Sequence, residues 1–132
     1  MTRYVKLAVT TLLTGYLLVV LGGAVRVAGA EAGCGPGWVG CDGSLAPILS
    51  FPIAFDYFHR AFAVVVTLLS VGLVVLAWRE SRSRGLLLGL SGAALGLVLI
   101  QGVLGFFTAQ PEAGAAVGTL HLALAEIFLA VV

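Results

Sequence analysis

The sequence predicts an all-α integral membrane protein, a bundle of four helices whose two termini face the cytoplasm. Of its 132 residues, 61% are hydrophobic and only 10% are charged, and the mean hydropathy is +1.15. In a soluble domain about a quarter of the residues are charged. Because one span of the hydrocarbon layer takes about 20 apolar residues, the chain has room for about four helices and little else. The net charge of +1 is too small to predict a nucleic-acid-binding surface.

Four apolar runs define the expected helices of a single transmembrane domain covering residues 1–132. The first run is too long for the core of a signal peptide and precedes no small-residue cleavage pattern, so we expect it to be retained. Pro52 and Pro111 suit the first turns of the second and fourth helices, where proline is tolerated. The expected helices are residues 5–27, 52–78, 85–109 and 114–132, with an outer loop over residues 28–51.

The cations predict the orientation of these helices. Arg3 and Lys6 lie at the start of the first helix, and three arginines lie in or beside the link between the second and third helices: Arg79, Arg82 and Arg84. Loops rich in lysine and arginine stay in the cytoplasm. We therefore expect a multi-pass protein of a prokaryotic plasma membrane whose 28–51 loop faces outward.

Cys34 and Cys41 lie in that outer loop. The outer face of a prokaryotic plasma membrane is an oxidising compartment, so we expect the two cysteines to form a disulfide. Such a bridge closes a small loop and contributes about 2 to 3 kcal/mol in the chain-entropy model. A redox or haem-handling role and a pair of reduced thiols are the alternatives to a purely structural staple.

His59 and His121 are the two histidines of the chain, and both lie inside apolar runs. His59 lies seven residues after Pro52 and His121 seven after Gly114, which places each about 10 Å down an inward-running helix. Ionisable residues within a membrane are costly and usually functional, and imidazole is a common axial ligand of haem iron. We therefore predict that this pair binds one haem.

Two other interpretations of the histidines remain. Either one alone is more often a hydrogen-bonded core residue than a ligand. Zinc fits less well than haem, because zinc sites usually have three or four protein ligands and only Asp56 and Glu126 could complete the set within the membrane. Glu126 lies deeper in the fourth helix with no obvious cationic partner, and no role is assigned to it.

Three charged residues flank the predicted haem site. Asp56 lies three residues before His59 and so projects from nearly the same face of the helix, which predicts a carboxylate beside the haem edge. Its alternative is an acid that supports the helix start or pairs with Arg60. Arg26 and Arg60 are candidates to bind the haem propionates, because a guanidinium group can bind a carboxylate bidentately. Extension of both arginines toward the lipid headgroups is the alternative.

A stripe of small residues runs along the third helix. Its members are spaced by four, three and four residues: Gly85, Gly89, Gly92 and Gly96. Small residues let helices approach closely, so we expect this stripe to pack against a helix within the chain or in another subunit. A groove for the porphyrin is the alternative.

Five short motifs, in order along nearly the whole chain, resemble those of the heme A synthase family. The first lies at the end of the first helix, in residues 22–26, and the second is the cysteine-bearing loop of residues 33–43. The third is the acid-x-x-His-Arg pattern of residues 56–60, and the last two lie in the third and fourth helices, at residues 101–108 and 121–125. This family is built from four-helix units whose histidine pairs serve haem.

The chain departs from the family pattern in three ways. The usual member has two four-helix units in one chain, one for the substrate haem and one for a haem b cofactor, so the resemblance implies that this single unit works as a homodimer or higher homo-oligomer. Asp56 replaces the more usual glutamate, which shifts the carboxylate by more than about 1 Å, roughly the length of one methylene step. Six residues separate the cysteines, one more than expected.

The resemblance implies oxidation of the C8 methyl group of haem O to a formyl group, through successive hydroxylations and loss of water, to give haem A for terminal oxidases. On this reading His59 and His121 bind the haem iron, Arg26 and Arg60 orient propionates, and Asp56 is the catalytic residue that stabilises charge or moves protons. The implied cofactor is haem b and the implied substrate is haem O. The expected partners are membrane lipid, a haem O synthase and an electron donor.

Two rival functions also fit the histidine pair. A bis-histidine b-type cytochrome would pass electrons without altering its haem, and a haem-binding assembly or carrier subunit would bind haem without turnover. The acid at the histidine turn and the cysteine loop disfavour the cytochrome, because electron transfer alone requires neither. A small transporter is not supported, since no repeated charged pathway appears.

Overall fold

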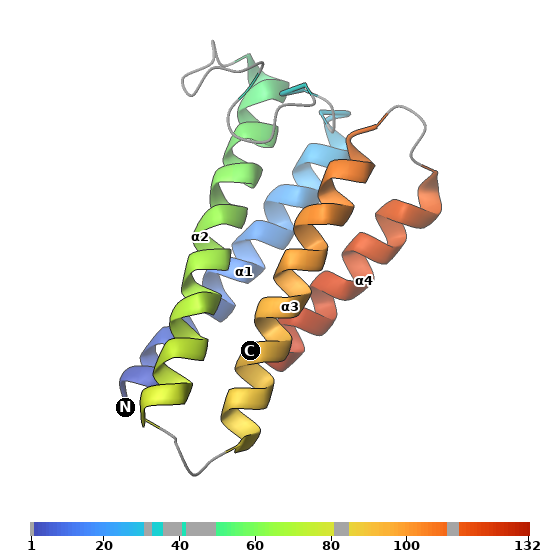
Figure 1. Ribbon diagram of the computed structural model, residues 1–132. Coiled ribbons are helices and arrows are strands. Elements are labelled where there is room, and N and C mark those ends of the chain that lie inside the picture. The colour runs from blue at the N-terminus through green and yellow to red at the C-terminus, as the bar shows by residue number, and fades with distance from the viewer. Residues whose placement is uncertain (1, 31–32, 36–40, 42–49, 81–84, 111–113) are drawn as a thin grey trace.

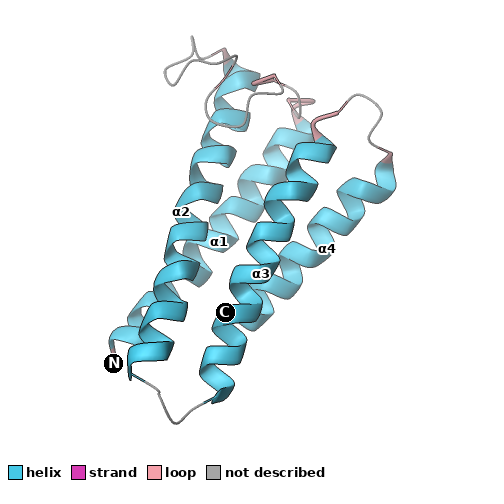
Figure 2. Cartoon of the chain, viewed as in Figure 1, coloured by secondary structure: helices cyan, strands magenta, loops and turns pink. Residues whose placement is uncertain are grey.

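The computed structural model describes residues 2–30, 33–35, 41, 50–80, 85–110 and 114–132. They form four α-helices (Figures 1 and 2), which are α1 (Arg3–Val27), α2 (Phe51–Glu80), α3 (Gly85–Thr108) and α4 (Ala115–Val131). The predicted all-α fold is confirmed, and each helix boundary lies within two residues of its predicted position. The predictions for Pro111, Arg82 and Arg84 concern residues that lie outside the described ranges.

Hydroxyl side chains inside the helices donate to their own backbone. Seven of them bond the carbonyl group four residues earlier: Thr10, Thr11, Thr14, Thr67, Ser70, Ser91 and Thr119. In lipid there is no water to satisfy a hydroxyl group, so this local bond makes serine and threonine tolerable within a span. At the start of α1 the Thr2 hydroxyl accepts from the Val5 amide at 3.3 Å and caps the helix.

The four helices run alternately up and down (Figure 1). Each helix packs against the next one along the chain, and α4 closes the bundle with a smaller contact against α1. The end of α1, the start of α2, the end of α3 and the start of α4 therefore share one end of the bundle. We call this the loop end, because it carries the segment between α1 and α2. Which side of the membrane it faces stays a prediction.

The apolar core lies away from the loop end. It is formed by Val66 of α2, Ala94 and Val98 of α3, and Phe128 of α4. The Phe128 ring also lies against α1, where a Cβ atom added at Gly15 would be 3.0 Å from its Cε1 atom. All four helices therefore meet around this cluster.

Large apolar side chains cover the outside of the bundle, as expected of a surface that faces lipid. Examples are Leu13, Leu68 and Leu86, whose residues are 60%, 65% and 74% exposed. Among the described residues, three helices, α1, α2 and α3, are long and apolar enough to cross a membrane, and α4 is a shorter apolar helix of 17 residues. The chain is a multi-pass membrane protein.

The glycine stripe of α3 does not pack as predicted within the chain. A Cβ atom added at any of its four glycines would meet no described atom within 4 Å. The spacing of small residues marks one helix face, but it does not tell which face turns toward the other helices. Close packing within the chain is therefore wrong for the described residues, and packing between subunits stays a prediction.

We predict that Phe128→Ala destabilises the bundle, because it leaves a cavity where the helices meet. A buried phenylalanine truncated to alanine typically costs about 3 to 5 kcal/mol. The matched control is Phe107→Ala, which truncates a half-exposed ring of α3. Thermal unfolding in detergent should show a clear fall in Tm for the first variant and little change for the second. Equal shifts in the two variants would contradict this assignment of the core.

Candidate functional site

His59 lies on α2 and His121 on α4, two helices that stand diagonally opposite each other in the bundle. Each side chain is turned toward the side on which the other lies. Each imidazole lies against a glycine of a neighbouring helix. A Cβ atom added at Gly22 of α1 would be 3.0 Å from His59 Cε1, and one added at Gly105 of α3 would be 3.6 Å from His121 Cε1. The two histidines are near enough to interact electrostatically. Their joint ligation of one haem stays a prediction.

The two imidazoles share an unusual feature, a buried ring nitrogen with no partner. The Nδ1 atoms of His59 and His121 are buried, and neither has a hydrogen-bond partner among the described residues. Most buried polar atoms in proteins are hydrogen-bonded. A neutral imidazole nitrogen without a partner is a potential metal ligand, so the pair fits axial ligation of a haem iron.

No group of three or more histidine, cysteine, aspartate or glutamate side chains comes together in the described part of the chain, and a bis-histidine haem requires no such group.

Arg26 lies one turn closer to the loop end than the histidines. It follows Gly22 by four residues on α1, and its guanidinium group lies against Gly118 of α4, three residues before His121. The missing side chain of Gly118 leaves room for the guanidinium group. Arg26 is itself exposed and the two histidines are half-buried, so the structure brings Arg26 to the edge of the region that holds His59 and His121.

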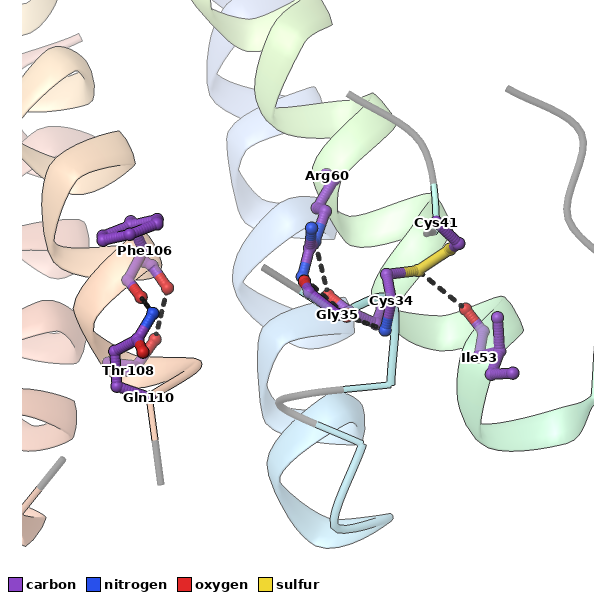
Figure 3. Close-up of polar contacts among 10 residues, drawn as sticks. Cys34, Gly35, Cys41, Ile53, Arg60, Phe106, Thr108 and Gln110 are labelled. Carbon is purple, nitrogen blue, oxygen red and sulfur yellow. Dashed lines mark hydrogen bonds and ion pairs between the residues drawn. A yellow bond between two sulfur atoms is a disulfide. The ribbon is translucent and has the colours of Figure 1, made fainter. Parts of the chain in front are cut away.

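Asp56 and Arg60 bind the segment between α1 and α2, and Figure 3 shows Arg60 beside Cys34 and Gly35. Arg60 donates from Nε to Asp56 Oδ1 and from Nη2 to Asp56 Oδ2, each at 3.0 Å. The Cys34 amide donates to Asp56 Oδ2 at 2.9 Å, and Arg60 Nη2 also donates to the Gly35 carbonyl at 3.1 Å. We call these four residues the loop anchor. Asp56 is only 4% exposed, so its carboxylate is stabilised by these three donors.

The loop anchor sits beside a disulfide. Cys34 and Cys41 are joined, as predicted, and Cys34 Sγ lies 3.7 Å from the Ile53 carbonyl oxygen of α2 (Figure 3). One cysteine of the bridge therefore holds α2 through both its backbone and its side chain. Through the disulfide, Cys41 is held at the same part of α2.

The geometry divides the predicted site residues into two groups, the histidines with Arg26 and the pair Asp56 and Arg60. In the structure Asp56 pairs with Arg60, which was the alternative given for Asp56 from the sequence. Both residues still interact electrostatically with His59, although their hydrogen bonds go to the loop. Their proposed roles at the haem edge and at the propionates stay predictions. Glu126 lies on the exposed side of α4, away from the histidines.

Gln101 of α3 was missed as a site residue. It lies four residues before Gly105, which His121 contacts, and its Nε2 atom is buried with no hydrogen-bond partner among the described residues. The other glutamine, Gln110, lies at the end of this segment and donates to the Phe106 carbonyl at 3.5 Å (Figure 3). A lone amide inside an apolar run was the available signal, since polar residues within a span are usually functional.

An apolar groove of about 420 Å³ lies between α1 and α2. Its lining consists of aliphatic and aromatic side chains only: Leu17, Val20, Leu21, Ala54, Phe55, Phe58 and Phe62. Neither histidine contributes to it. It is therefore a separate feature from the histidine site.

Comparison with known proteins places this arrangement in a family context. The chain is 31% identical over 120 residues to the heme A synthase of Alkalihalophilus pseudofirmus, a match that covers 89% of this chain and 40% of that protein. The chain is related to the heme A synthases. No family model matches the sequence, and no solved structure matches it.

A second group of relatives carries a different name. The chain is 36% identical over 130 residues to protoheme IX farnesyltransferase 1 of Natronomonas pharaonis, a match covering 98% of this chain and 27% of that protein. With the protoheme IX farnesyltransferase of Halobacterium salinarum it shares 32% over 123 residues, 93% of this chain and 26% of that protein. This relative of the heme A synthases therefore spans well under half the length of the curated relatives it matches.

We predict that Gly22→Ala destabilises the chain relative to Gly23→Ala. Both substitutions add one methyl group to neighbouring positions of α1, but only the first would meet His59, whereas the second would meet nothing within 4 Å. Overpacking of this kind costs about 1 to 3 kcal/mol. Thermal unfolding in detergent should rank Gly22→Ala below Gly23→Ala. If the two variants unfold together, the His59 ring does not lie against Gly22.

Proposed function

We propose that this chain is a heme A synthase unit that oxidises the C8 methyl group of haem O to a formyl group. The observation that carries the proposal is the pair of buried, unpartnered Nδ1 atoms of His59 and His121 on opposed helices. The kinship with heme A synthases supports the same conclusion. The proposed product is haem A, the haem of terminal oxidases.

The proposed roles follow from position in the bundle. His59 and His121 would hold the haem iron, and each ring lies against a glycine of a neighbouring helix, Gly22 and Gly105 respectively. Arg26, one turn nearer the loop end, binds a propionate, because its guanidinium group lies at the edge of the same interior. A haem b cofactor, when bound, supplies the oxidative redox chemistry.

Asp56 is the proposed catalytic carboxylate. Its charge reaches His59, and it would stabilise positive charge or accept a proton at the substrate edge. Arg60 keeps this carboxylate in one orientation through its two hydrogen bonds. The further proposal that Arg60 binds a propionate requires the propionate to join a guanidinium group that already holds Asp56 and Gly35.

One histidine pair can bind one haem, but the proposed reaction needs two bound haems, the substrate and the cofactor. We propose that two copies of the chain provide the two sites as a homodimer. The proposed location is a prokaryotic plasma membrane.

The farnesyltransferase relatives point to a partner. A region similar to this chain occurs within longer proteins named protoheme IX farnesyltransferase. Farnesylation of protoheme is the class of reaction that would supply haem O. We therefore propose that the chain works beside such an enzyme, and that a separate electron donor serves the oxidation.

We predict that His59→Ala and His121→Ala each abolish six-coordinate haem binding. Removing either imidazole leaves the iron with at most one protein ligand from this site. Absorption spectra and haem-to-protein ratios of purified variants are the measurements. Glu126→Gln is the control, because that side chain lies on the exposed face of α4. Retention of a bis-histidine spectrum by either alanine variant would remove its histidine from the site.

We predict that Asp56→Asn retains haem but loses product. The amide keeps the size of the side chain and removes its charge, and loss of one charged transition-state contact typically costs about 100-fold or more in rate. The assay is expression with a haem O supply in a host without its own heme A synthase, followed by mass-resolved chromatography of extracted haems. Arg60→Lys is the companion variant, because it weakens the loop anchor and keeps the Asp56 carboxylate.

The two variants separate catalysis from support. If haem A production falls in parallel with thermal stability in both variants, Asp56 acts only as part of the loop anchor. Normal haem A production by Asp56→Asn excludes the catalytic role altogether. If the unaltered chain folds with haem yet leaves haem O unchanged, the chain is a cytochrome or carrier instead of a synthase.

A further inference from the structure

Gln101 occupies a defined place on the inward face of α3. Buried and half-buried residues of this helix recur at spacings of three and four residues, which is the pattern of a helix packed in a bundle. The face comprises Ser91, Ala94, Val98, Gln101, Gly105 and Thr108. Gln101 thus lies between Val98, a member of the apolar core, and Gly105, against which His121 packs. It therefore lies one helical turn from the residue that His121 contacts.

The Gln101 carboxamide has a buried donor that is not hydrogen-bonded among the described residues. Its Nε2 atom is buried and makes no hydrogen bond to any described residue. Leaving a buried donor unsatisfied costs about 1 to 3 kcal/mol, and the penalty persists in lipid because water is absent. Glutamine at this point is therefore explained by a bound molecule with a polar group at the same depth.

Three polar elements follow one another along the bundle axis. Arg26 lies one turn toward the loop end from the histidine level, and Gln101 lies one turn from it in the opposite direction. At 1.5 Å per residue the two levels are about 12 Å apart. A porphyrin held by the histidines and oriented by Arg26 would therefore present its edge opposite the propionates to Gln101.

We propose that the Gln101 carboxamide binds the hydroxyl group on the farnesylated side chain of haem O and so selects haem O over protoheme. This inference rests on the proposed function. The hydroxyl-bearing chain of haem O occupies the position of one vinyl group of protoheme, on the edge away from the propionates. A site that hydrogen-bonds a hydroxyl group discriminates against an analogue lacking it, because the buried amide is then left unpaired.

The test is a titration of purified protein in detergent with haem O and, separately, with protoheme. Gln101→Met removes both polar atoms at nearly constant volume and should weaken haem O binding about tenfold, the value of one hydrogen bond, while the Kd for protoheme stays unchanged. Gln101→Glu, neutral when buried, keeps a donor and an acceptor and should retain the preference. Gln110→Met is the control at the other glutamine.

Each outcome decides the inference. A tenfold loss of preference in Gln101→Met alone supports it. An unchanged ratio of the two Kd values, or an equal loss of both haems, overturns it, because Gln101 is then neutral or merely structural. Should Gln101→Met fail to fold, Gln101→Asn, whose amide is one methylene shorter, takes its place with the same expectation.

The inference and the proposed function fail in different ways. If the unaltered chain makes haem A but binds haem O and protoheme equally well, the role of Gln101 is wrong and the synthase proposal stands. If the chain prefers haem O through Gln101 yet makes no haem A, the hydroxyl contact stands and the chain is a haem O carrier.

Discussion

The structure depends on one constraint, that every polar group inside the membrane needs a partner within the protein. The hydroxyl groups of the helices meet it by bonding their own backbone, and Asp56 meets it through Arg60 and the Cys34 amide. Against this background the buried nitrogens of His59, His121 and Gln101 stand apart, since none has a partner among the described residues. The proposed haem site would give all three a partner, which is why we treat them together.

Glycines give this site its shape. Gly22, Gly105 and Gly118 belong to three different helices, and each leaves room for one functional side chain: His59, His121 and Arg26 respectively. A Cβ atom at Gly22 or Gly118 would force the side chain opposite to move, whereas one at Gly105 would make an ordinary contact with His121. The chemistry of the site is thus set by charged and aromatic residues, but their places are set by residues with no side chain.

Sequence reasoning reached the fold and the histidines, because both depend on local rules. Apolar runs of membrane-spanning length gave the helices, and the distances of His59 and His121 from their helix starts gave their common depth. Arg60 could be foreseen as a partner of Asp56 because it lies one turn away, but the Cys34 amide could not, since it lies 22 residues away in a loop without periodicity. The inward face of α3 was also missed, because in lipid both faces of a helix are apolar and hydrophobic periodicity no longer distinguishes them.

The pairing of helices also bears on how the protein is made. His59 already lies against Gly22 within the α1–α2 hairpin, and His121 against Gly105 within the α3–α4 hairpin. Each hairpin therefore carries one histidine already placed against its neighbouring helix. The loop anchor belongs wholly to the first hairpin, whereas the proposed haem site needs both. On that proposal haem would bind only after the two hairpins had docked, and its binding would report that docking.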